Sequence, residues 1–120
     1  MAKFRVEFFY DVVSPWSWLG FETAVRYATQ YSSAFTLVMR PFFLGGVMKA
    51  TGNQPPAVLP ARGAYMAKDL GRSFVHHHMP PFQFPTRFPL NTIKSQRLLT
   101  ALSLEEYATS RRERCANIDT

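Results

Sequence analysis

The sequence predicts an α/β fold built on one strand–helix–strand unit. Two runs rich in β-branched and aromatic residues, Arg5–Tyr10 and Phe35–Arg40, predict strands. Between them, apolar residues recur at the spacing of one helix face, at Trp18, Phe21, Val25 and Ala28. Two strands joined through a helix over so short a stretch form a parallel pair with a right-handed crossover.

The stretch after the first strand predicts a tight turn into the helix. Ser14 can accept a hydrogen bond from the free N–H groups of the first helical turn, and Pro15 has no N–H to leave unpaired. We therefore expect the helix to run from Pro15 to Tyr31. A helix start carries partial positive charge and unpaired N–H donors, so this turn suits an anion.

Four residues of this turn, Ser14–Ser17, have the S-x-x-S layout of a thioredoxin-like active site in which serine replaces both cysteines. In the cysteine version, the helix start stabilises a thiolate. With Ser14 and Ser17 no dithiol chemistry is available, but the same field and a hydroxyl donor could stabilise a thiolate brought in by a ligand. The competing interpretation is that Ser14 acts only as a helix cap.

The residues after the second strand change in character. Pro41 lacks an N–H donor, so we expect the strand pairing to end there. Turn-forming pairs follow at Gly45–Gly46, Gly52–Asn53 and Pro55–Pro56. A loop as long as Phe42–Pro60 is uncommon as a plain connector in a compact domain, which predicts a functional loop or a lid.

The second half of the chain predicts two more helices. One spans Ala61–Val75, and the other starts at Asn91–Thr92, with an apolar stripe of Leu98, Leu99 and Leu102. Between them lies a proline-rich extended segment, Met79–Pro89, whose phenylalanines are expected to pack. The run His76–His78 does not predict a metal site, because consecutive residues do not share a helix face and no acid or cysteine is near in sequence.

Composition and charge limit the classes of function. A chain of 120 residues, 47% of them hydrophobic, is one domain at most, and no apolar run is long enough to span a membrane. The net charge is +6, which favours anionic ligands, but the basic residues stand singly, so we expect no nucleic-acid binding. We expect no secretory signal or presequence, and the single Cys115 favours a reducing compartment.

Several stretches resemble the kappa-class glutathione transferases of the thioredoxin-like superfamily, in order and in spacing. They are Phe8–Glu22, Arg40–Pro41, Gly46–Lys49, Gly52–Pro56, Leu59–Pro60, Gly63, Tyr65–Ala67, Asp69–Leu70 and Leu98–Ala101. The nearest family outside the class, the 2-hydroxychromene-2-carboxylate isomerases, also uses glutathione and a similar serine–proline turn. The Met48–Pro56 stretch resembles the transferases more closely.

The resemblance implies a thioredoxin-like unit over residues 1–42 and part of an inserted all-helical region over residues 43–120, with a tail that diverges from about residue 107. Transferases of this class continue well beyond this length. The additional residues supply further strands, a loop that pairs with the glutathione backbone, and a charged pair for its γ-glutamyl end. We therefore expect an incomplete sheet in this chain.

The resemblance also implies a detoxifying glutathione transferase, which joins the glutathione thiolate to small electrophiles and needs no metal. In family terms Ser14 is catalytic, and glutathione binds to Ser14, Pro15, Trp16 and Asn53. It further implies a homodimer at full length, located in mitochondria or peroxisomes, with the cytoplasm as the alternative.

Two other functions remain open. One is the glutathione-dependent isomerase, and the other is a non-catalytic fragment that binds or dimerises. Because family contacts to glutathione are missing from these 120 residues, we expect them to bind it weakly and to have little or no activity by themselves.

Overall fold

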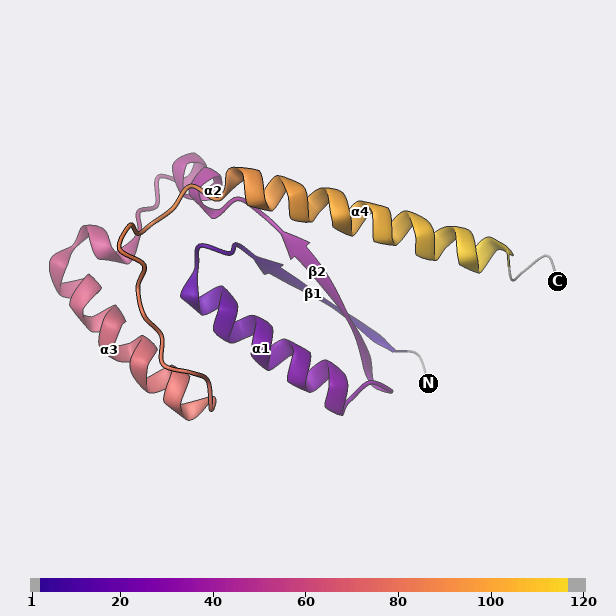
Figure 1. Ribbon diagram of the computed structural model, residues 1–120, viewed down its shortest axis with the longest axis horizontal. Coiled ribbons are helices and arrows are strands. Elements are labelled where there is room, and N and C mark those ends of the chain that lie inside the picture. The colour runs from indigo at the N-terminus through magenta and orange to yellow at the C-terminus, as the bar shows by residue number, and fades with distance from the viewer. Residues whose placement is uncertain (1–2, 117–120) are drawn as a thin grey trace.

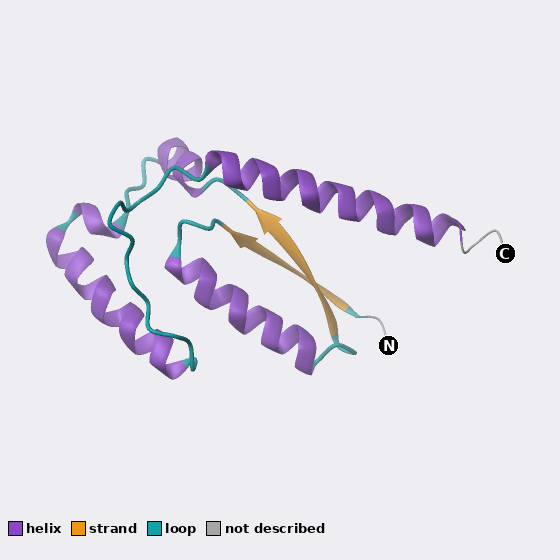
Figure 2. Cartoon of the chain, viewed as in Figure 1, coloured by secondary structure: helices purple, strands orange, loops and turns teal. Residues whose placement is uncertain are grey.

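A computed structural model describes residues 3–116, with side chains described to residue 106. The elements follow the order strand, helix, strand and then helices (Figures 1 and 2), which confirms the predicted α/β class. They are β1 (Phe4–Tyr10), α1 (Pro15–Gln30), β2 (Phe35–Pro41), α2 (Leu44–Thr51), the 3-10 turn η1 (Pro56–Val58), α3 (Pro60–His76) and α4 (Ile93–Ala116).

The two strands pair in parallel, from Phe4 opposite Phe35 to Tyr10 opposite Pro41. The pairing continues past its predicted end, because the N–H of Phe42 donates to the carbonyl oxygen of Tyr10 at 3.0 Å. In a parallel ladder alternate N–H groups point to the same neighbour, so the N–H that Pro41 lacks would lie on the open side of β2. Proline therefore removes no bond here.

The buried core lies between α1, α3 and the segment after α3, and not on the sheet. Its members are Leu19, Leu70, Phe74 and Met79, with Met66 and Phe82 packed against them. The rings of Trp18 and Phe74 meet edge to face with centroids 5.3 Å apart, and Phe82 lies 5.4 Å from Phe74. The expected packing role of the phenylalanines in 79–89 is thus confirmed for Phe82.

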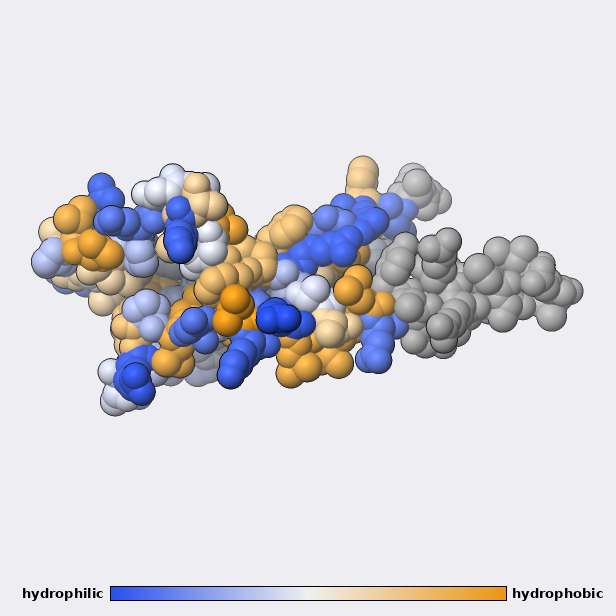
Figure 3. All heavy atoms as spheres, turned by 90° about the horizontal axis from the view of Figure 1, so that it is seen from above, coloured by the Kyte–Doolittle hydropathy of each residue, from blue (hydrophilic) through white to orange (hydrophobic). Residues whose placement is uncertain are grey.

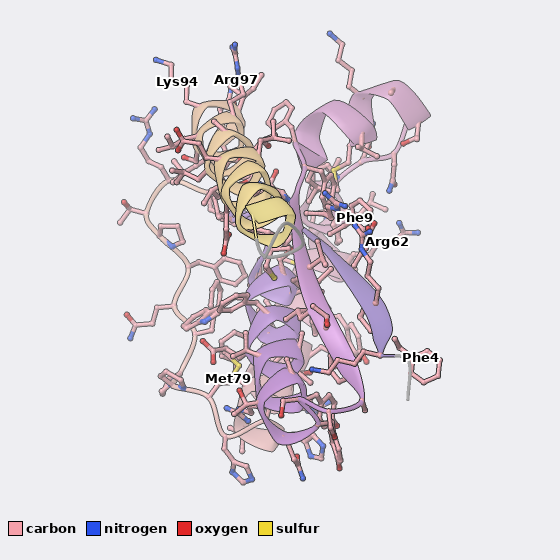
Figure 4. The ribbon with its side chains drawn as sticks, turned by 90° about the vertical axis from the view of Figure 1, so that its right-hand side faces the viewer. Phe4, Phe9, Arg62, Met79, Lys94 and Arg97 are labelled. Carbon is pink, nitrogen blue, oxygen red and sulfur yellow. The ribbon has the colours of Figure 1, made fainter. Side chains whose placement is uncertain are left out.

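Neither strand contains a buried residue. Val6 and Leu37, on the face toward α1, border a hollow of about 800 Å³ beside that helix. Phe4 is 76% exposed and points away from the fold (Figure 4). Apolar side chains also remain visible among hydrophilic ones on the face shown in Figure 3. The described sheet is incomplete, as the sequence predicts.

The segment Phe42–Pro60, which the sequence predicts to be a functional loop or a lid, contains the helix α2. Gly45 and Gly46, predicted as a turn, belong to this helix. A Cβ atom at Gly46 would lie 2.9 Å from Cδ1 of Phe43, so the glycines make room for that aromatic ring. Gly52 does form the predicted turn: it ends α2 with a left-handed φ of 70°.

Helix α4 touches the rest of the fold mainly at its start and then projects beyond the sheet (Figure 1), in a molecule of 62 × 31 × 24 Å. The predicted helix is confirmed, but its apolar stripe is mostly unpacked, because Leu98 and Leu102 are 61% and 52% exposed. None of the helices formed by described residues combines the length and the apolar character that crossing a bilayer needs. The side chain of Cys115 lies outside the described ones.

His78 follows the C-terminal end of α3 and has a positive φ of 55°, a backbone conformation that favours glycine. Its N–H donates to the carbonyl of Val75, and that of Met79 to the carbonyl of Phe74, a pattern that usually carries glycine at the left-handed position. We expect His78→Gly to stabilise the protein by about 0.5–1 kcal/mol in urea unfolding. His76→Gly, inside the helix, should destabilise it by a similar amount. Equal effects of the two variants would contradict this account.

The face of the sheet opposite α1 carries two ion pairs that share the carboxylate of Glu7. Arg40 donates to Oε1 of Glu7 at 2.9 Å, and Arg5 contacts the same oxygen at 2.5 Å. The hydrogen bond from Arg40, followed by the charges of both arginines, lowers the pKa of Glu7 below its ordinary 4.5. A lowered pKa stabilises the fold above the unfolded value, and the contribution is lost as pH falls through the folded value.

Glu7→Gln should therefore lower the melting temperature slightly at neutral pH. The gap to wild type should close as the pH falls below about 4.5, because Glu7 then becomes neutral in both states. High salt should also narrow the gap at neutral pH, since exposed ion pairs are screened. A gap that persists in acid would assign the effect to something other than charge.

Candidate functional site

Ser14 stands where β1 gives way to α1. It is the N-cap of α1, with extended backbone angles, and its Oγ accepts a hydrogen bond from the N–H of Ser17 at 3.2 Å. Its own N–H donates to the carbonyl oxygen of Asp11 at 3.0 Å, which closes the turn. The predicted helix start at Ser14–Pro15 is confirmed, and α1 ends at Gln30, one residue before its predicted end.

Two hydrogen-bond donors remain available at this helix start. The N–H of Trp16 and the hydroxyl hydrogen of Ser14 have no acceptor among the described residues. Pro15 lies between them and contributes no N–H. Both donors belong to the end of α1 that carries partial positive charge, so the turn can stabilise the negative charge of a bound anion.

Asp11 is fully buried, and its carboxylate stabilises the turn through hydrogen bonds. One carboxylate oxygen, Oδ1, accepts from the N–H of Val13 at 3.0 Å and from the Thr92 hydroxyl at 2.7 Å. The other, Oδ2, accepts from the N–H of Leu44, the first residue of α2, at 2.8 Å. A single carboxylate therefore ties together the Ser14 turn, the start of α2 and the start of α4.

No role for Asp11 is predicted from the sequence, although it lies between the first predicted strand and Ser14. The available signal was its residue type and position, because an Asp side chain in a turn can accept a hydrogen bond from the backbone N–H two residues further along the chain. The N–H of Asp11 also contacts Oγ of Ser17 at 3.4 Å, and its carbonyl oxygen accepts from the N–H of Ser14, so the backbone of Asp11 contacts both ends of the S-x-x-S stretch.

A cavity of about 490 Å³ opens beside the turn. Ser14, Pro15 and Trp16 line it together, so three of the four predicted site residues are brought to one place. The rest of its wall is mainly apolar and comes from α2, η1, α3 and the segment before α4: Phe43, Met48, Pro55, Pro56, Met66, Phe88, Pro89 and Leu90. The predicted loop 42–60 thus forms one side of the cavity.

Asn53 is not among the residues that line this cavity. It is exposed, just after α2, and its Oδ1 accepts from the N–H of Gln54 at 2.9 Å. Its own N–H donates to the carbonyl of Met48 at 3.0 Å. The side chain is thus seated in the predicted turn, near the two prolines of the same loop, Pro55 and Pro56, that do reach the cavity.

A second hollow, of about 690 Å³, lies on the other side of Ser14 and Pro15. It is bordered by the carboxyl end of the sheet, by α1 and by α4, and Tyr10 is one of its lining residues. Burial raises the pKa of the Tyr10 phenol above its ordinary 10.0. Among the described residues, no three His, Cys, Asp or Glu side chains are placed to share a metal ion.

Comparison with known proteins shows what this chain is similar to. Human glutathione S-transferase kappa 1 is 44% identical over 105 residues, which cover 83% of this chain and 45% of the human protein. The rat protein of the same name is 43% identical, covering 84% and 46%. Glutathione s-transferase kappa 2 of Caenorhabditis elegans is 38% identical, again covering 84% and 46%.

The chain spans about half the length of these curated relatives. No solved structure matches it significantly. The resemblance to the kappa class and the thioredoxin-like fold, both predicted from the sequence, are confirmed. Residues 5–117 match the family described as DSBA-like thioredoxin domain, and the chain therefore belongs to that family.

Proposed function

We propose that this protein is a glutathione transferase, with glutathione as co-substrate and a small electrophile as its partner in the reaction. The observation that carries the proposal is the pair of available donors, the Ser14 hydroxyl and the Trp16 N–H, at a helix start beside a cavity. The similarity to proteins named glutathione S-transferase kappa supports the same conclusion.

In the proposed reaction the S–H bond of glutathione breaks, and its proton passes to water while the sulfur keeps the electron pair. The Ser14 hydroxyl and the Trp16 N–H donate to the resulting thiolate, and the positive end of α1 lowers its energy further. The sulfur then forms a bond to an electrophilic carbon. With a halogenated nitroaromatic substrate, the halide leaves with the electrons of the broken bond.

For binding, we propose that Ser14, Pro15 and Trp16 contact glutathione around its thiol. We also propose Asn53 as a contact, since its side-chain NH₂ has no acceptor among the described residues and can donate to a peptide ligand. The mainly apolar wall that includes Met48 and Met66 suits an uncharged electrophile better than a charged one.

The decisive assay compares two substrates in the presence of glutathione. A transferase should conjugate a halogenated nitroaromatic and release halide, whereas the isomerase would convert a hydroxychromene carboxylate without consuming glutathione. For the full-length protein, we expect halide release only. Turnover of the chromene with no conjugation would overturn the proposal in favour of the isomerase.

The serines at the turn also predict the absence of disulfide oxidoreductase activity. Ser14 and Ser17 stand where a redox pair would need two cysteines, and a hydroxyl forms no disulfide. In an insulin-reduction assay with dithiothreitol, the protein should give the same rate as buffer. Thioredoxin serves as the positive control, and a clear acceleration by this protein would contradict our interpretation of the turn.

We further propose a homodimer and a location in mitochondria or peroxisomes, with a role in detoxification, from the resemblance to the kappa class alone. Sedimentation of the full-length protein tests the dimer. Microscopy of the same protein, tagged at a terminus that leaves targeting intact, tests the compartment.

A further inference from the structure

The start of α4 presents two deeply buried polar side chains. Thr92 and Gln96 are only 7% and 3% exposed. They lie four residues apart, a spacing that puts both on the same side of the helix. Lys94 and Arg97, on neighbouring positions, point outward into solvent instead (Figure 4). The buried side faces the turn that carries Ser14, so these two residues need an explanation.

Thr92 acts on the turn through Asp11. Its hydroxyl donates to Oδ1 of Asp11 at 2.7 Å, and this bond joins residues that lie 81 positions apart in the sequence. The carbonyl of Asp11 in turn accepts the N–H of Ser14 at 3.0 Å. A hydrogen bond to a carboxylate is stronger than one between neutral groups. The position of Asp11, and with it the backbone of Ser14, is therefore set partly from α4.

Gln96 acts on the strand ends on either side of Asp11. Its Nε2 donates to the carbonyl oxygens of Tyr10 and Phe42, each at 2.8 Å. Because both partners are carbonyl oxygens, only the NH₂ side of the amide can face them. One side chain thus links the last residue of β1 to the residue after β2, where the turn and α2 begin.

This arrangement leaves a buried atom without a partner. Oε1 of Gln96 accepts no hydrogen bond in the described part of the protein. An unsatisfied buried acceptor is destabilising, and an apolar side chain of the same length would avoid it. The glutamine instead fixes the distance between the end of β1 and the end of β2, directly before the Ser14 turn.

We propose that Thr92 and Gln96 are positioning residues for Ser14, which hold its hydroxyl and the Trp16 N–H in the geometry that binds a thiolate. This inference rests on the proposed function for its chemical consequence. The positioning itself is a property of the free protein, so it is testable without glutathione.

The first measurement is amide hydrogen exchange in the free protein. Thr92→Val should raise the exchange rates of the Ser14 and Ser17 amides roughly tenfold or more relative to that of Thr23 in the middle of α1, because the hold on Asp11 is lost. Thr92→Ser keeps the hydroxyl and should restore both rates. Thr100→Val is the matched control, since that hydroxyl bonds only to the carbonyl of Gln96 within α4.

Gln96→Met provides a second, independent variant in case Thr92→Val does not fold. It keeps side-chain length, removes the unpaired oxygen, and leaves the bond between Thr92 and Asp11 intact. The Ser14 amide should again exchange faster relative to Thr23. If Gln96→Met and every folded Thr92 variant keep these ratios within about twofold of wild type, the positioning role is overturned.

The second measurement, made on the full-length protein, is the pKa of the thiol in bound glutathione, followed by thiolate absorbance against pH. Thr92→Val and Gln96→Met should move this pKa toward that of free glutathione, while Thr92→Ser and Thr100→Val should leave it at the wild-type value. A purely structural role would change the melting temperature without moving the pKa, and would overturn the proposal. A wild-type protein that does not lower the thiol pKa would instead overturn the proposed function itself.

Discussion

In the full-length protein, replacing Ser14 with alanine is expected to lower the turnover of glutathione with a halogenated nitroaromatic by ~10²–10³-fold, the usual effect of removing a donor to the reacting charge. The Ser14 hydroxyl has no acceptor among the described residues and stands beside the N–H of Trp16, so both can donate to one thiolate. The same change should raise the pKa of the bound thiol, measured by thiolate absorbance.

Ser14 also caps α1, and the two roles need to be separated. Its Oγ accepts from the N–H of Ser17, and losing such a cap to alanine costs about 1 kcal/mol of stability. Glycine at the same position removes the hydroxyl but costs only a few tenths of a kcal/mol. We expect Ser14→Gly to lose as much turnover as Ser14→Ala while melting close to wild type.

The opposite pattern would reduce Ser14 to a helix cap. In that case turnover would follow stability, with Ser14→Gly nearly as active as wild type and Ser14→Ala impaired only near its melting temperature. Ser14→Thr supplies the rescue, because it keeps both the hydroxyl and an acceptable cap.

The strand–helix–strand unit was predictable from the sequence to within a residue or two at most boundaries. Its signals are local: β-branched and aromatic residues for the strands, and the Ser14–Pro15 pair for the start of α1. Helix α2 was not predictable in this way. Gly45 and Gly46 favour a turn when the neighbours are unknown, and only the packed ring of Phe43 explains why glycine is required inside a helix.

The same distinction, between local sequence signals and contacts with distant residues, applies to the candidate site. Ser14, Pro15 and Trp16 are contiguous, so a motif predicts them together. Their support comes from Thr92 and Gln96, which bond to residues 81 and 86 positions away. No periodicity in a single sequence relates such distant positions. The sequence placed a threonine at a helix start, and only the fold shows that its hydroxyl bonds to Asp11.

The largest effect on stability is expected at Asp11. Its carboxylate accepts three hydrogen bonds, from Val13, Leu44 and Thr92, and is fully buried. Asp11→Ala leaves these donors without their acceptor, and hydrogen bonds to a charged group contribute about 1.5–3 kcal/mol each. Since Val13 is only partly buried and water can reach it, we expect a total loss of about 3–5 kcal/mol.

A loss of that size matters more here than in an average domain. The buried hydrophobic core of the described part has only four members, Leu19, Leu70, Phe74 and Met79, and whole domains are stable by only about 5–15 kcal/mol. Asp11→Ala should therefore be largely unfolded near room temperature, as measured by urea titration with tryptophan fluorescence, since both Trp16 and Trp18 lie next to the turn.

Two further variants make the Asp11 prediction specific. Asp11→Asn keeps one acceptor oxygen but turns an NH₂ group toward the N–H of Leu44 or toward Thr92, so it should be intermediate in stability. Asp69→Ala, the same change at a carboxylate with no hydrogen bond or ion pair among the described residues, should stay within about 0.5 kcal/mol of wild type. If Asp11→Ala unfolds at the same urea concentration as Asp69→Ala, the carboxylate does not hold the three elements together, and the Ser14 turn must owe its geometry to its local sequence alone.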